Sequence, residues 1–253
     1  YTLNAEQLAA TRIAAMEYGV PISIHLSESP FEVQYSKDTY GKTSIDLLES
    51  IGFFEGPTIA AHVVWPTDEE IPTLAARKVG VIHNPTSNMK IASGIAPITE
   101  MLAAGVRVGL GTDGAASNND LDMWEEMRLA SLLQKVDRMN PEALSATTVL
   151  TMATRGGATA IGLGDSIGSL EIGKRADLIQ VEFDDVHHVP TYDVVSHLVW
   201  VSDEQDVASV VVDGKVLMRD GEILTIDTER VAAEARALAA RIQAALQERN
   251  QPQ

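Results

Sequence analysis

Three strand-like segments of this chain each end in a histidine, and a fourth ends in an aspartate. The segments are Ile22–His25, Ile59–His62, Val81–His83 and Val108–Asp113. A (β/α) barrel builds its active site on one rim, from the ends of several parallel strands and the loops that follow them. Repeated metal-binding or proton-carrying side chains at successive strand ends therefore predict such a rim.

Helical patterns alternate with these strands, as in a parallel α/β fold. We expect helices over 5–18, 42–51, 67–78, 97–104 and 121–135, and two shorter ones within 141–163. The steps from His25 to Asp113 average about 29 residues, close to the roughly 31 per unit of an eight-unit barrel of about 250 residues. Only four such strands are predicted, so the fold class is α/β with half of a TIM-type (β/α)8 barrel.

The pattern changes after about residue 165. Short strands are expected at 178–183, 194–201, 208–212 and 215–219, with a hairpin turn at Asp213-Gly214,. An Ala-rich amphipathic helix over 228–249 is expected to pack on the outside. The predicted divisions are the barrel half over 1–164, a small β-sandwich module over 165–226 and the C-terminal helix over 227–253.

Composition narrows the possible partners and metal ligands. The chain has no cysteine, so any metal must be held by His and carboxylate ligands, which suits zinc or iron,. Its net charge of −17 favours a small-molecule partner over nucleic acid,. No apolar run approaches the roughly 20 residues of a membrane span, and no signal peptide is visible, so we expect a cytoplasmic protein. The chain starts at Tyr1 rather than Met, which is typical of a fragment.

Each candidate residue has a structural alternative. Glu28 follows His25 by three residues and places an acid near a metal ligand, although a core histidine with a surface glutamate has the same pattern. Asp113 lies before Gly114, and Asp-Gly is also a common turn pair. His62 alone fits a structural role better, and His83 fits a bracing role in its polar loop. His187, His188 and His197 show no ligand spacing and are expected to be solvated or structural.

Several motifs together resemble the amidohydrolase superfamily, most closely its 5′-methylthioadenosine/S-adenosylhomocysteine deaminases and their chlorohydrolase relatives. They are His25-Leu-Ser-Glu28, Ala61-His62, His83-Asn-Pro-x-Ser-Asn-x-Lys90-x-Ala-Ser-Gly94, Gly109-Leu-Gly-Thr-Asp-Gly-Ala-Ala-Ser-Asn-Asn-x-Leu-Asp122, Gly168–Leu178 and Val210–Lys215. The resemblance covers nearly the whole chain. It implies that the four strands are the fifth to eighth of the barrel, hence its C-terminal half.

The resemblance also implies roles for individual residues. His25 and Asp113 would bind one divalent metal, zinc or alternatively iron. Glu28 would hydrogen-bond the purine and protonate a ring nitrogen, and His62 would hold the attacking water. Asp113 would also take the water's proton, and Ser117 would lie near the substrate. The implied reaction is hydrolytic deamination of an adenosine-type nucleoside, and the implied assembly is a homo-oligomer.

One family element has no counterpart. The family also binds metal through a His-x-His pair on its first barrel strand, and this sequence contains no His-x-His. We therefore expect an N-terminal half carrying that pair to complete the site. Two alternatives stay open: an enzyme acting on another heteroaromatic such as guanine or an s-triazine, and a non-catalytic fragment whose sheet edges pair with a partner chain.

Overall fold

The computed structural model describes residues 2–249, which form two compact units. The first unit contains the described residues up to Lys174 together with Asp184–Glu204. The second contains Arg175–Phe183 and the described residues from Gln205 onward. No helix among the described residues combines the length and apolarity that a bilayer crossing requires.

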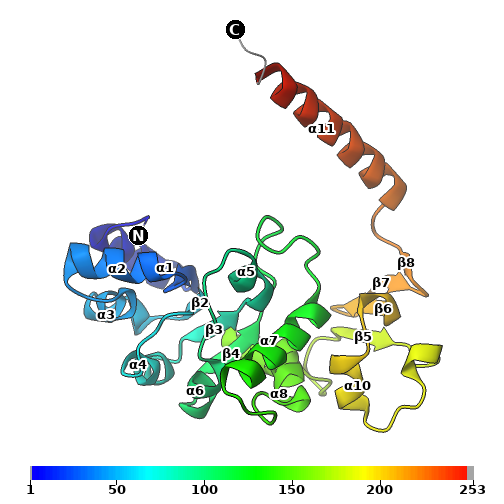
Figure 1. The fold of residues 1–253 in the computed structure, drawn as a ribbon, viewed down its shortest axis with the longest axis horizontal. Coiled ribbons are helices and arrows are strands. Elements are labelled where there is room, and N and C mark those ends of the chain that lie inside the picture. Colours follow the sequence, from blue (N-terminus) through cyan, green and yellow to red (C-terminus); the bar gives the residue numbers. More distant parts are fainter. Residues whose placement is uncertain (1, 250–253) are drawn as a thin grey trace. The chain divides into compact units, whose positions relative to one another are not determined.

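The first unit alternates strands and helices (Figure 1). Its strands are β1 (Ile22–Leu26), β2 (Thr58–His62), β3 (Gly80–His83) and β4 (Arg107–Leu110). Its helices are α1 (Ala5–Tyr18), α2 (Pro30–Tyr40), α3 (Ser44–Ser50), α4 (Glu70–Ala76), α5 (Pro85–Lys90), α6 (Ile98–Ala103), α7 (Met123–Asp137), α8 (Ala146–Thr151), α9 (Gly157–Ala160) and α10 (Val194–Trp200).

The strands form one parallel sheet in the order β1-β2-β3-β4. Parallel strands need crossover connections, and α2–α3, α4 and α5–α6 supply them,. Strand residues such as Ala60, Val81 and Val108 join the buried core with Ile45, Leu74 and Met101 of the helices. The predicted α/β alternation is confirmed, and the carboxyl ends of all four predicted strands lie at the same end of this sheet.

Helix α9 lies very close to the sheet at two glycines. A Cβ on Gly80 would lie 1.8 Å from the Ala160 carbonyl oxygen, and one on Gly109 would lie 2.8 Å from the Gly157 Cα. No side chain fits at either strand position without moving the helix. These glycines therefore set the spacing between β3, β4 and the helix layer.

The prediction of a strand over 194–201 is wrong. These residues form α10, which begins after Asp193, whose Oδ1 accepts a hydrogen bond from Ser196 N at 2.7 Å. The helix packs against α7 and α8, and Val199 is fully buried. The β-branched valines of this segment favour a strand. Their β propensity is weak, however, and tertiary packing overrides it here.

The second unit contains an antiparallel sheet and a long helix. The sheet order is β5 (Leu178–Val181), β6 (Val207–Val212), β7 (Lys215–Arg219) and β8 (Glu222–Ile223). Asp213 and Gly214 both have left-handed backbones, which form the tight turn between β6 and β7, so the predicted hairpin is confirmed,. Helix α11 (Thr228–Arg249) matches the predicted C-terminal helix.

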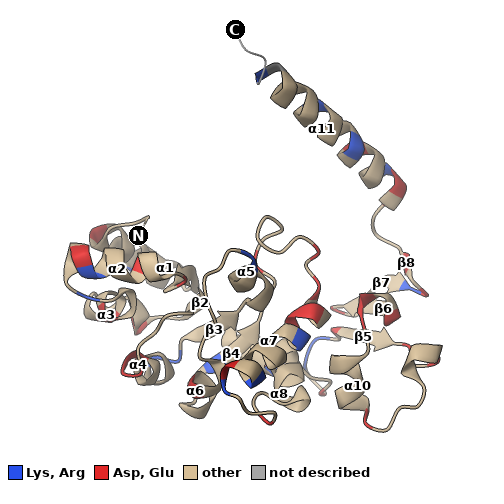
Figure 2. Ribbon diagram, in the orientation of Figure 1, with Lys and Arg blue, Asp and Glu red and all other residues tan. Residues whose placement is uncertain are grey.

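Acidic residues outnumber basic ones in the chain as a whole. The sequence carries 36 Asp and Glu against 19 Lys and Arg. Figure 2 shows that the acidic positions are spread over many helices and loops rather than gathered in one segment. The excess negative charge is therefore a general property of the chain.

Candidate active site

The carboxyl ends of the four parallel strands bring the predicted polar side chains together. His25 and His62 lie at the ends of β1 and β2, where Leu26 is paired with His62. His83 ends β3 and pairs with Leu110, the last residue of β4, and Asp113 follows three residues later. Because the strands are parallel and nearly in register, their carboxyl ends lie side by side at one end of the sheet.

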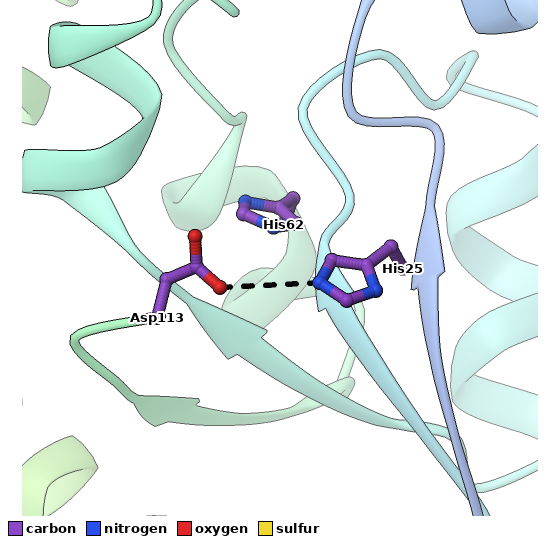
Figure 3. A group of neighbouring side chains, drawn as sticks. All are labelled: His25, His62 and Asp113. Carbon is purple, nitrogen blue, oxygen red and sulfur yellow. Dashed lines mark ion pairs between the residues drawn. The ribbon is translucent and has the colours of Figure 1, made fainter. Parts of the chain in front are cut away.

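Three of these side chains form a potential metal-binding group. One ligand atom from each of His25, His62 and Asp113 lies within 4.8 Å of the others (Figure 3). His25 Nε2 is 3.9 Å from Asp113 Oδ1, and the two imidazole rings stack with centroids 5.3 Å apart. His62 Nε2 is buried and has no hydrogen-bond partner among the described residues. Two imidazoles and a carboxylate are a donor set that suits zinc, so these residues fit a divalent metal.

Asp113 has one oxygen held by hydroxyl groups and the other directed at His25. Ser87 Oγ donates to Asp113 Oδ2 at 2.8 Å, and Ser117 Oγ donates to the same oxygen. Burial acts to raise the pKa of Asp113, but hydrogen bonds from Ser117, Ser87 and Gly114 together with nearby His62 hold it below its usual value. Asp113 is therefore kept as a carboxylate with Oδ1 available.

His62 is completely buried and contacts polar groups on both ring nitrogens. Its Nδ1 lies 2.8 Å from Asn88 Oδ1 and 3.4 Å from Asn84 Nδ2. Its Nε2 lies 3.9 Å from Glu28 Oε1. His62 also has a left-handed backbone with φ of 73°, which is uncommon for a non-glycine residue,. Sparsely populated backbone states of this kind cluster at active sites.

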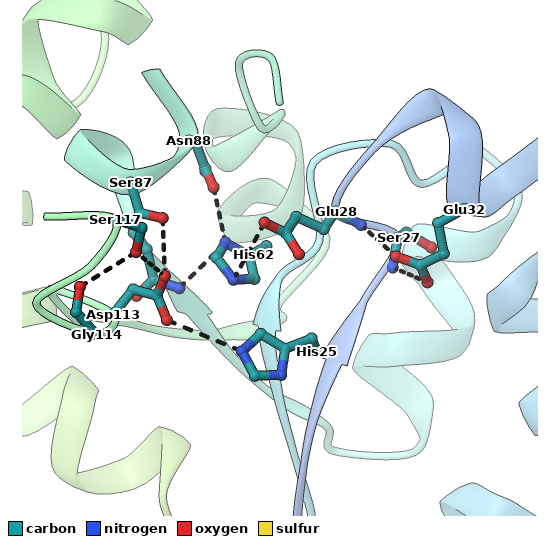
Figure 4. A network of polar contacts seen from close by, with 11 residues as sticks. His25, Ser27, Glu28, Glu32, His62, Ser87, Asn88, Asp113, Gly114 and Ser117 are labelled. Carbon is teal, nitrogen blue, oxygen red and sulfur yellow. Dashed lines mark hydrogen bonds and ion pairs between the residues drawn. The ribbon is translucent and has the colours of Figure 1, made fainter. Parts of the chain in front are cut away.

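Glu28 is positioned by the start of α2. Glu32 accepts hydrogen bonds from the backbone N–H groups of Ser27 at 2.7 Å and Glu28 at 2.8 Å, and Ser29 caps the helix (Figure 4). A cavity of about 420 Å³ borders both His25 and Glu28, which is the size range of small-molecule sites,. Tyr35 and Tyr40 of α2 line the same cavity, so Glu28 and His25 share a space large enough for a ligand.

His83 lies apart from the metal-binding group. It is 1% exposed, and burial followed by the proximity of His62 lowers its pKa to about 3. Neither ring nitrogen has a hydrogen-bond partner among the described residues. The bracing role of His83 stays a prediction, because its imidazole makes no hydrogen bond to the loop among the described residues. The rings of His187, His188 and His197 pack against one another elsewhere in the first unit.

The contacts of Ser87, Asn88 and Glu32 were missed by sequence reasoning. The helices α2 and α5 that carry them were also missed, although each begins with proline directly after Ser29 or Asn84. Proline at the first helical position after a polar residue is a recognisable start signal. Their partners in the site are not visible from sequence, because Ser87–Asp113 and Asn88–His62 contacts join different strand ends.

Comparison with known proteins agrees with this geometry. The profile of the Amidohydrolase family matches residues 1–217. The chain is 50% identical over 242 residues to a 5-methylthioadenosine/S-adenosylhomocysteine deaminase from Desulforudis audaxviator, covering 96% of this chain and 56% of that protein. The chain thus spans a little over half the length of the curated relatives it matches.

Solved structures show the same relationship. A zinc-bound adenosine deaminase from Xanthomonas campestris superposes with a TM-score of 0.93 at 38% identity, over 96% of this chain and 56% of that one. An atrazine chlorohydrolase from Arthrobacter aurescens, complexed with zinc, gives 0.86 at 35% identity, over 93% and 52%. Both similarities extend over more than nine tenths of this chain. This chain belongs to the amidohydrolase family.

Proposed function

We propose that this chain is part of a metal-dependent aminohydrolase that deaminates an adenosine-type nucleoside, 5′-methylthioadenosine or S-adenosylhomocysteine. The observation that carries the proposal is the placement of Glu28 on one side of a metal-binding group formed by His25, His62 and Asp113. Glu28 Oε1 is 3.9 Å from His62 Nε2, and Asp113 Oδ1 is 3.9 Å from His25 Nε2. The similarity to a deaminase of that name supports the substrate class.

Replacing an aromatic amine by water requires an acid, a base and an activated nucleophile. A bound divalent ion supplies the last of these by lowering the pKa of water to about 7. Glu28 donates a proton to a ring nitrogen as the carbon bearing the amine becomes tetrahedral. Asp113 accepts the proton that the water loses and delivers it to the amine, which leaves as ammonia, while the hydroxyl on the tetrahedral carbon returns its proton to the Glu28 carboxylate. His62 holds the water by its free Nε2, and Ser117 keeps Asp113 in place.

The metal site is proposed to be completed by residues outside this chain. His25 and Asp113 are the two ligands we assign, and His62 Nε2, although it lies near both, is assigned to the water. Catalytic zinc usually has three protein ligands. We propose that a His-x-His pair, which the family carries on its first barrel strand, comes from the half of the protein that this chain does not span. Zinc is the favoured metal, and iron accepts the same ligand types.

The same proposal gives each unit a place in the complete protein. The parallel sheet is the second half of a (β/α)8 barrel and the antiparallel sheet is part of a β-sandwich. The proposed boundaries are 1–164, 165–226 and 227–253. A homo-oligomeric assembly is proposed by analogy with the family. The TIM-barrel-type fold of the amidohydrolase neighbours supports the barrel part of this proposal.

The test is release of ammonia from 5′-methylthioadenosine and S-adenosylhomocysteine by the complete, zinc-loaded protein. Glu28→Gln keeps the size of the side chain but cannot deliver the proton, so kcat should fall about 10²–10⁴-fold. Glu17→Gln, at an exposed position of α1, is the matched control and should leave kcat unchanged. Undiminished activity in Glu28→Gln would overturn the role of Glu28 as the acid.

A second candidate is a hydrolase acting on another heteroaromatic. It is favoured by the 35% identity to an atrazine chlorohydrolase. A panel of guanine, s-triazines and adenosine derivatives, compared by kcat/KM, separates the candidates. If every substrate is inert while zinc binds stoichiometrically, both enzymatic proposals fail and the non-catalytic alternative is favoured.

A further inference from the structure

The one-and-a-half-turn helix α5 contacts two site residues through adjacent side chains. Ser87 Oγ donates to Asp113 Oδ2 at 2.8 Å. Asn88 Oδ1 lies 2.8 Å from His62 Nδ1. Ser87 and Asn88 are 0% and 1% exposed, so neither hydrogen bond competes with bulk water. Two neighbouring residues of one helix thus set the orientation of groups from two different strands (Figure 4).

Helix α5 is itself fixed to the loop that follows β4. The backbone N–H of Thr86 donates to Oε2 of buried Glu126 at 3.2 Å, and Asn118 Nδ2 donates to Oε1 of the same carboxylate at 2.6 Å. At the other end of the helix, Lys90 Nζ donates to the Ala116 carbonyl at 3.0 Å. These contacts tie α5 to the segment that carries Asp113, which makes it a rigid base for both side chains.

The contact with Asn88 determines which nitrogen of His62 carries the proton. An amide oxygen only accepts hydrogen bonds, so Nδ1 at 2.8 Å from Asn88 Oδ1 is the protonated nitrogen in this arrangement, in which Asn88 Nδ2 has no hydrogen-bond partner among the described residues,. Asn84 Nδ2 only donates and lies farther away, at 3.4 Å, so it does not reverse this assignment. The lone pair then belongs to Nε2, which is buried and faces Glu28.

We propose that α5 is an alignment element for the site, with Asn88 and Ser87 as positioning residues. Asn88 holds His62 as the Nδ1–H tautomer, so Nε2 acts only as a lone-pair donor toward water or metal. Ser87, with Ser117, occupies Asp113 Oδ2 and leaves Oδ1 directed at His25. The meaning of this alignment for catalysis rests on the proposed function, but the tautomer itself does not.

Nitrogen-15 NMR of the complete, zinc-loaded protein tests the tautomer without substrate. His62 signals, assigned by their loss in His62→Gln, should show a protonated Nδ1 and an unprotonated Nε2 in the native protein. Asn88→Asp retains an acceptor and should keep this tautomer, whereas Asn88→Leu should lose it. A protonated Nε2 in the native protein, as a reversed Asn88 amide would produce, overturns the proposal even if Asn88→Leu fails to fold. An unchanged tautomer in Asn88→Leu also overturns it.

Kinetics provide the second readout. Removing a group that orients a metal-site residue typically costs about 10–100-fold in activity or metal affinity. Ser87→Ala should therefore lower kcat or zinc affinity by about that factor with little change in KM, and Ser87→Thr should restore it. Met89→Ala, at a 40% exposed position of the same helix, is the control and should change neither. Equal effects of Ser87→Ala and Met89→Ala would reject a positioning role, whereas the absence of deaminase activity in every form would reject only the proposed function.

Discussion

The two ends of the parallel sheet differ in the buried polar groups that they hold. At the amino end of β2, buried Arg12 donates from Nε to the Phe53 carbonyl at 2.6 Å and from Nη2 to Thr58 Oγ1 at 2.6 Å, while its Nη1 has no hydrogen-bond partner among the described residues. At the carboxyl ends, His62 Nε2 and both ring nitrogens of His83 are buried without such a partner. The amino end therefore uses most of the Arg12 donors within the fold, while the carboxyl ends keep His62 Nε2 available for a ligand.

Backbone strain is concentrated at the carboxyl ends of the strands. Ser27, His62, Val63 and Asp113 all have positive φ angles there, whereas Lys78, before β3, is the non-glycine residue with a positive φ next to an amino end. Each such residue costs of order 1–3 kcal/mol and persists only because the surrounding structure enforces it. The proposed site therefore lies where most of this strain is found, and substitutions at the two ends should separate activity from stability.

Asp113→Asn is expected to give the largest difference between its effect on activity and its effect on stability. Loss of the base should lower kcat about 10²–10⁴-fold. Asparagine tolerates the left-handed backbone and can still accept the hydrogen bonds from Ser87 and Ser117, so the Tm of the metal-free protein should change little,. Steady-state kinetics of the zinc-loaded protein and thermal unfolding of the metal-free protein measure the two effects, with exposed Asp165→Asn as the control. A large fall in the Tm of the metal-free protein would contradict the assignment of Asp113 to the chemistry.

At the amino end of the sheet, we expect a substitution to lower stability and to leave activity unchanged. Arg12→Met removes the Arg12 donors from the Phe53 carbonyl and Thr58 Oγ1, and leaves the Pro57 carbonyl with only the Ile22 N–H, so the free energy of unfolding should fall by about 3 kcal/mol,. Denaturant titration measures this loss, and kcat per folded molecule should be unchanged. Arg77→Met removes an exposed ion pair with Glu49 and should destabilise much less,. A kcat that fell with Arg12→Met would show that the two ends are coupled.

A smaller effect is expected from His83 as pH falls. The unfolded chain binds a proton at His83 near pH 6.5, whereas burial lowers the folded pKa to about 3. Between those values the unfolded state holds more protons, so the free energy of unfolding should fall by about 1.4 kcal/mol per pH unit. Denaturant titrations from pH 7 to 4 should show a shallower slope for His83→Gln than for the native chain. Equal slopes would mean that His83 is not kept neutral.

Short sequence patterns predicted most of the strands and helix ends that position the site. The apolar runs ending in His25, His62 and His83 are strands, and Gly19 with φ of 64° ends α1 as expected. These features depend on neighbours in sequence. The strand predicted over 194–201 failed because a buried Val199 and the Asp193 cap outweighed β-branched composition. The pairing of Ser87 with Asp113 and of Asn88 with His62 was invisible, because it depends on how separate strand ends converge.

The open edges of the parallel sheet have a practical consequence for handling the chain. Among the described residues, β1 and β4 each present one edge with no neighbouring strand. Unpaired edges are templates on which strands of other molecules can add. During refolding from denaturant, correct pairing therefore competes with self-association, which rises with protein concentration. The yield of refolded chain that has not self-associated should therefore depend on the protein concentration as much as on temperature or buffer.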